Sequence, residues 1–91
     1  MFIPMDCAHV EALRRFLDSS ADAEATEENG YIVDAFEAEP PAALELRFEK
    51  KGLEILAARE LRYDEELDGW YLGEAIEDAA VVSGVLETMT K

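Results

Sequence analysis

The sequence predicts a two-layer α+β domain, in which a largely antiparallel sheet of three to four strands carries an N-terminal and a C-terminal helix on one face. Three observations predict this class: apolar residues at helical spacing near each end, alternating residues in the middle, and short turn signals between them. The 91 residues suit one domain, and 49% of them are apolar, which is enough for a folded core. We therefore expect residues 1–91 to form a single acidic α+β domain.

The first element is a helix that Asp6 is placed to cap. Four apolar residues follow at helical spacing: Val10, Leu13, Phe16 and Leu17. Between residues 18 and 29 the only apolar side chains are alanines. This stretch is therefore either a solvated helical extension or a mobile loop, and Asn29–Gly30 is a suitable stop for it.

The middle of the chain predicts strands joined by tight turns. Residues 31–39 are rich in β-branched and aromatic side chains, and the two prolines at 40–41 end this strand. Leu44, Leu46 and Phe48 alternate with charged residues and give the clearest strand signal. The Lys50-Lys51-Gly52 turn leads into residues 53–67, whose apolar spacing also fits a helix. We favour a strand there because a hairpin turn calls for a pairing partner.

The last elements are a short strand and a helix. A turn at Asp68-Gly69 leads into a strand at residues 70–72. Residues 74–89 then predict a helix with one apolar stripe: Ala75, Ala79, Val82, Leu86 and Met89. Glu74, Glu77 and Asp78 lie near its expected N-terminus, where the helix dipole favours negative charge.

The charge is large and unevenly distributed along the chain. The sequence has 22 acidic and 8 basic residues and a formal net charge of −14. This balance argues against direct binding to nucleic acid or to an anionic membrane, since phosphate contacts need Lys and Arg. Residues 16–46 and 63–90 contain acids and no base. Between them lie the cations that are candidates for a positive face of their own: Arg47, Lys50, Lys51, Arg59 and Arg62.

Two base-free acidic segments predict either a surface that only aids solubility or one that meets a basic protein partner. A carboxylate array can occupy a groove that Lys and Arg offer to phosphates. We therefore expect a non-enzymatic acidic inhibitor that binds a basic, nucleic-acid-binding surface as a nucleic-acid mimic. In composition alone the chain resembles small phage anti-defence inhibitors of anti-CRISPR or anti-restriction type. The alternatives are an immunity protein or antitoxin that neutralises a nuclease toxin, and a small homo-oligomeric assembly subunit such as a dimer.

The candidate partner-binding residues form two patches. Four carboxylates lie on a predicted hairpin loop between aromatic residues: Asp64, Glu65, Glu66 and Asp68. Trp70 follows them and suits an interface anchor and a core residue equally well. The second patch, which also fits a solvated loop, consists of Asp22, Glu24, Glu27 and Glu28.

Catalytic residues, metal ligands and cofactors are not predicted. Residues 64–69 resemble the start of a calcium loop, but the twelfth position, which needs a bidentate Glu, is Ala75. His9 and Cys7 are two residues apart and do not share a helix face. A single cysteine suits a reducing compartment, and the sequence has no signal peptide or membrane span, so we expect a cytoplasmic protein.

Overall fold

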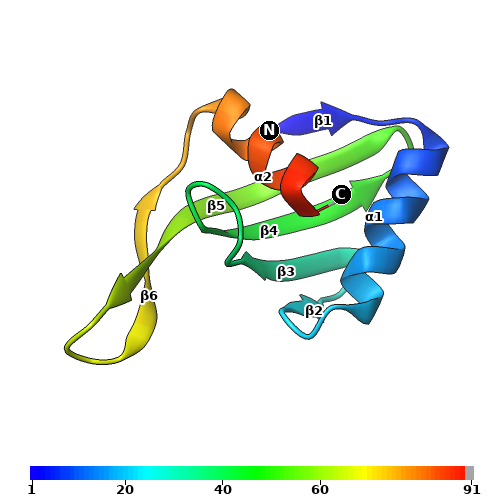
Figure 1. The fold of residues 1–91 in the computed structure, drawn as a ribbon. Coiled ribbons are helices and arrows are strands. Elements are labelled where there is room, and N and C mark those ends of the chain that lie inside the picture. Colours follow the sequence, from blue (N-terminus) through cyan, green and yellow to red (C-terminus); the bar gives the residue numbers. More distant parts are fainter. Residues whose placement is uncertain (90–91) are drawn as a thin grey trace.

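The computed structural model describes residues 1–89 and has six strands and two helices (Figure 1). In chain order these are β1 (Phe2–Pro4), α1 (Cys7–Ser19), β2 (Ala23–Ala25), β3 (Gly30–Ala35), β4 (Ala42–Glu49), β5 (Gly52–Asp64), β6 (Gly69–Ala75) and α2 (Ala79–Met89). The sheet is antiparallel, in the order β1-β5-β4-β3-β2, and β6 pairs with β5. The α+β class is thus as expected, whereas the sheet has six strands rather than three to four.

The two strands that the sequence did not predict are the short ones at the sheet edges. β1 pairs with the start of β5, and β2 pairs with β3 through Glu24 opposite Ile32. Of the segment between residues 18 and 29, the first two residues complete α1, and the rest contains β2 and a hairpin turn rather than a helical extension or a loop without regular structure. Three residues are too few to show a period of two, so pairing with a longer neighbour stabilises these strands.

α1 begins as the sequence predicts. The Asp6 side chain accepts a hydrogen bond from the backbone N–H of His9 at 2.9 Å, which satisfies one of the free amides of the first turn. Leu13 and Leu17 are fully buried, but Phe16 on the same stripe keeps 39% of its surface exposed. The helix ends at Ser19, whose hydroxyl donates to the carbonyl oxygen of Phe16.

One hydrophobic core joins both helices to the same face of the sheet. Every second residue of β4 is buried: Ala42, Leu44, Leu46 and Phe48. Apart from Glu60, which lies opposite Ala42, their cross-strand neighbours on β3 and β5 belong to the same cluster. The cluster also contains Leu13 and Leu17 of α1 and four residues of α2: Val82, Val85, Leu86 and Met89. The opposite face is open, and Ile32 and Glu45 are exposed on it. This arrangement is the predicted two-layer packing.

β5 is a strand throughout, as the hairpin argument predicted, and it is longer than its neighbours. Residues 52–60 pair with β4, whereas residues 61–64 pair only with β6. Residues 61–72 therefore form a hairpin that projects from the sheet, and we call it the β5–β6 arm (Figure 1). The projection contributes to an elongated shape of 43 × 26 × 25 Å.

The chain around α2 differs from the prediction at one end. Residues 74 and 75 belong to β6, and the helix begins only at Ala79. The backbone N–H of Ile76 donates to the Ala58 carbonyl oxygen at 2.8 Å, which extends the strand pairing past the end of β6. Asp78 then accepts from the N–H of Ala80 at 2.9 Å. Within residues 1–89, neither helix has the length and apolar character needed to cross a membrane.

Candidate protein-interaction surface

The four predicted carboxylates at the tip of the β5–β6 arm are of two kinds, those that accept hydrogen bonds within the arm and those that do not. Asp64 accepts hydrogen bonds from the backbone N–H groups of Glu66 at 2.9 Å and Leu67 at 3.4 Å. Asp68 has a left-handed backbone with φ of 50° and accepts a hydrogen bond from the Tyr63 hydroxyl. Asp64 and Asp68 therefore hold the turn. Glu65 and Glu66 are exposed, and their carboxylates have no partner within residues 1–89.

The bond between Tyr63 and Asp68 ties the two strands of the arm together at the tip. This hydrogen bond raises the pKa of Tyr63 above its usual value of 10.0, because it stabilises the protonated phenol and is lost when the phenol ionises. Partial burial acts in the same direction. The phenol is protonated at neutral pH and donates to Asp68 across the arm.

An aromatic cluster lies on one face of the arm. The strand register places Tyr63 opposite Trp70, and their ring centroids are 5.4 Å apart. The Trp70 ring is also 5.1 Å from that of Phe36, which lies in the β3–β4 loop. Trp70 lies outside the core cluster, and 46% of its surface is exposed. Trp70 thus joins the arm to the body while offering half of its indole to solvent.

The arm exposes further apolar residues that sequence reasoning did not select. Leu67 at the tip is 78% exposed and Leu72 on β6 is 52% exposed. A leucine inside an acidic turn is a signal that could have marked Leu67, since turn residues are normally polar. No sequence pattern marks Phe36, because its contact with Trp70 forms only when the fold brings together two segments that are distant in the sequence.

The second predicted patch belongs to an ordered hairpin. Asp22 precedes β2, Glu24 lies on β2, and Glu27 and Glu28 form the turn to β3. That turn is closed by hydrogen bonds from Thr26 N–H to the Gly30 carbonyl oxygen, 2.8 Å, and from Gly30 N–H to that of Glu27, 3.2 Å. Because β2 is at the opposite edge of the sheet from β6, with β5, β4 and β3 between them, the two acidic patches do not join.

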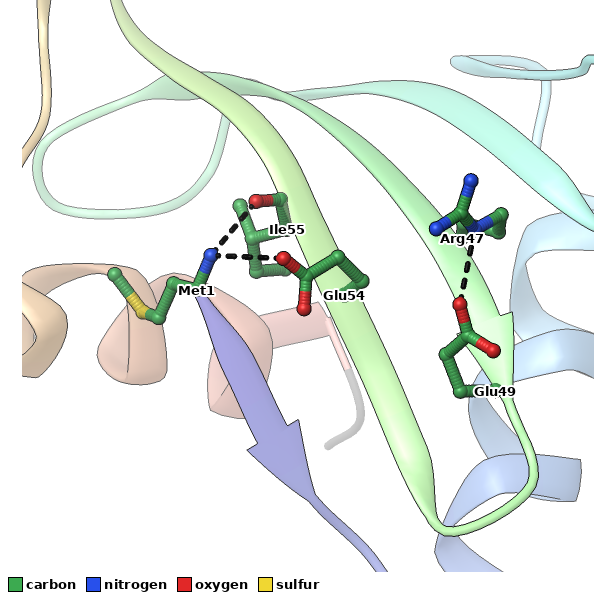
Figure 2. A network of polar contacts seen from close by, with 5 residues as sticks. All are labelled: Met1, Arg47, Glu49, Glu54 and Ile55. Atoms are coloured by element: carbon green, nitrogen blue, oxygen red, sulfur yellow. Dashed lines mark hydrogen bonds and ion pairs between the residues drawn. The ribbon is translucent and has the colours of Figure 1, made fainter.

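Most cations of the basic stretch are held by nearby oxygen atoms rather than gathered on one face. Figure 2 shows Arg47, whose Nε lies 3.0 Å from Glu49 Oε1, and Glu54, which accepts from the Met1 ammonium group at 3.2 Å. The other two arginines behave similarly: Arg62 pairs with Glu60 at 2.7 Å and Arg59 donates to the Gly73 carbonyl oxygen at 2.6 Å. Lys50 and Lys51 lie at the opposite end of β5 from the arm tip.

Comparison with known proteins gives no relative, since no protein-family model, no curated protein and no solved structure matches the chain. The functional interpretation therefore depends on the geometry of the β5–β6 arm.

Proposed function

We propose that the chain is a non-enzymatic binding protein that places the β5–β6 arm against a basic surface of a protein partner. One observation carries the proposal. The arm projects from the sheet (Figure 1), and it exposes large apolar side chains beside a tip that bears only acidic charge. These apolar residues are Tyr63, Leu67, Trp70, Tyr71 and Leu72. Apolar side chains gathered on one projection and bordered by charge are typical of interaction sites.

The parts of the arm have different roles in this proposal. Trp70 is the anchor, because a large amphipathic ring dominates binding energy when a partner removes water from it. Glu65 and Glu66 pair with Lys or Arg of the partner and increase the rate of encounter. The hydrogen bonds of Asp64 and Asp68 fix the turn before binding, so less conformational freedom is lost in the complex.

The partner that best fits this surface is a nucleic-acid-binding enzyme or complex, which the chain inhibits by mimicry. The support is the net charge of −14 and the two unpaired carboxylates at the tip, which can replace phosphates in a basic groove. Since the two acidic patches lie at opposite edges of the sheet, the mimicry is assigned to the arm. This is the chemistry of an anti-defence inhibitor. A nuclease toxin as partner would instead make the chain an immunity protein or antitoxin.

A capture experiment with matched charge reversals tests the proposal. The immobilised chain is exposed to a cell extract, and the retained protein is identified by mass spectrometry. The affinity of this protein for the chain is then measured with purified components. Glu65→Lys combined with Glu66→Lys should weaken binding by more than about tenfold, since each exposed pair contributes up to about 1 kcal/mol and reversal adds repulsion. Glu27→Lys combined with Glu28→Lys changes the net charge equally at the other patch and should have little effect.

Two further measurements complete the test: the dependence of binding on salt, and competition by a nucleic-acid ligand. Binding should weaken steeply as NaCl increases, and a nucleic-acid ligand of the partner should compete with the chain. Equal losses in the two charge-reversal variants, or binding that does not respond to salt, would show that the arm tip is not the electrostatic contact.

A further inference from the structure

β6 is a sheet edge whose residues all remain accessible to solvent. It pairs with β5 alone, and within residues 1–89 no strand lies along its second edge (Figure 1). Every residue of β6 is exposed or half-buried, and the large apolar side chains of Trp70, Tyr71 and Leu72 are exposed. Alternate residues of such a strand point their backbone N–H and C=O groups away from the paired strand, so these groups can accept a further strand.

Sheet edges in folded proteins are usually protected against pairing, but residues 69–72 contain neither a proline nor a charged residue. The register irregularity between β5 and β6 lies between Arg59 and Leu61, so residues 61–64 pair regularly with residues 69–72. These four regular pairs exceed the three that hold β1, and the three that hold β2, in the same sheet. The free edge of β6 is therefore long enough to hold a further strand.

Acidic residues flank this edge at both ends. Glu65 and Glu66 precede it in the arm turn, and Glu74 follows it on β6. All three are exposed, and none has a side-chain partner within residues 1–89. The nearby cations of β5, Arg59 and Arg62, already donate to acceptor oxygens. An acidic strand would therefore meet like charge here, whereas a strand with Lys or Arg at its ends is complementary.

We propose that β6 accepts an extended segment of the protein partner as an additional strand, with apolar residues at the centre of the segment and Lys or Arg at both ends. The source of the segment rests on the proposed function, whereas the capacity of the edge to pair does not. Main-chain hydrogen bonds supply affinity in this mode of recognition. The apolar residues of the segment pack beside Trp70 and Leu72 on one face of the arm and beside Tyr71 on the other. A second copy of this chain fits less well, because its own β6 brings acidic residues to the same two ends.

Three peptides test the edge without the partner. The first is acetyl-Lys-Lys-Thr-Val-Thr-Val-Thr-Lys-Lys-amide, the second has Glu in place of Lys, and the third is the first peptide with every Thr and Val N-methylated. Titrated into the 15N-labelled chain, the first peptide should shift the amides of residues 69–75 in a saturable way, and the other two should bind at least about tenfold more weakly. Equal binding of the N-methylated peptide would overturn the proposal, because this peptide keeps the charge but lacks the main-chain donors.

Matched charge reversals locate the binding site. Glu66→Lys combined with Glu74→Lys changes both ends of the edge and should invert the preference, so that the Glu peptide binds more tightly than the Lys peptide. Glu27→Lys combined with Glu28→Lys changes the net charge equally at the β2–β3 turn and should keep the original preference. The same response in both variants would mean that the peptides sense only the net charge, and would overturn the proposal.

Self-association is measured on the chain without peptide. The amide shifts of residues 69–75 should not depend on the concentration of the chain, and sedimentation velocity should show a monomer. Shifts that grow with concentration, together with a dimer in sedimentation, would assign the edge to a second copy and overturn the partner strand.

The two proposals fail separately. Should the first peptide pair with β6 while the arm-tip variants leave the partner complex intact, the proposed function is wrong and the edge remains. Should the arm-tip variants abolish the complex while the N-methylated peptide binds as well as its parent, the edge proposal alone is wrong.

Discussion

At the scale of single residues, some acidic side chains hold turns and helix ends, whereas others face solvent on the surface. Asp6, Asp64 and Asp78 accept backbone N–H groups at the start of α1, in the arm turn and before α2. Aspartate suits these positions because its short side chain reaches the backbone of the following residues. The cap at Asp6 could be predicted from its place before an apolar stripe. The turn role of Asp64 could not, because the same residue also fits a surface patch.

Asp34 gives a prediction about pH and stability. Its pKa is raised by burial and by Asp22, so its charged form destabilises the folded state at neutral pH. Asp34→Asn should therefore increase the free energy of unfolding at pH 7. As the pH falls through the raised pKa, the wild-type carboxyl takes up a proton and the advantage of the variant should disappear.

Urea denaturation between pH 3.5 and 7.5 checks this expectation. Glu45→Gln, an exposed acid on the open face of the sheet, is the control and should show a much flatter difference from wild type. A stability gain for Asp34→Asn that is constant over this pH range would contradict the assigned cause.

At the scale of elements, the alternation at Leu44, Leu46 and Phe48 and the turn at Gly52 were enough to predict the central hairpin. The edge strands were missed because β1 and β2 gain their order from neighbours rather than from their own pattern. The start of α2 was misplaced because helix propensity favours residues 74–78, whereas pairing with the long β5 keeps residues 74 and 75 in a strand. The projection of the arm depends on the unequal lengths of β4 and β5.

Gly52 links the central hairpin to β1 and gives a second prediction. A Cβ atom there would lie 2.1 Å from the carbonyl oxygen of Ile3 on β1, and the residue has φ of 157°. Gly52→Ala should therefore separate β1 from β5 and lower the free energy of unfolding by about 2 kcal/mol or more. Gly84→Ala is the control, because nothing lies within 4 Å of its Cβ position in α2 and alanine favours helix by about 1 kcal/mol. Equal effects at the two positions would contradict the close approach.

Removing the aromatic cluster should destabilise the arm locally and leave the core of the sheet unaffected. Trp70→Ala deletes ring contacts with Tyr63 and Phe36, and each such pair contributes about 0.5–1.5 kcal/mol. Amide hydrogen exchange in residues 61–72 should accelerate by about tenfold or more, while the core strands β3 and β4 stay protected. Leu67→Ala at the exposed tip should leave both regions unchanged. Uniform loss of protection would mean that Trp70 supports the core.

At the scale of the whole molecule, the net charge of −14 causes repulsion between like charges, which destabilises the folded state. Added salt should therefore stabilise the protein, by about 1 kcal/mol between 20 and 300 mM NaCl, which for this size is about 4–8 °C in the unfolding midpoint. Calorimetry at both salt concentrations measures this shift, and sucrose at equal osmolality separates screening from solute exclusion. A midpoint that falls with salt would show that favourable ion pairs outweigh repulsion.

Lys50 and Lys51 lie at one end of β5 and the acidic tip lies at the other, so the two ends of this strand carry opposite charge. A positively charged surface therefore exerts a torque that turns the molecule tip-first before contact. In 0.1 M salt this torque acts within about 10 Å of the surface. Neutralising Glu65 and Glu66 at the tip should consequently reduce the fraction of productive collisions, and so slow association.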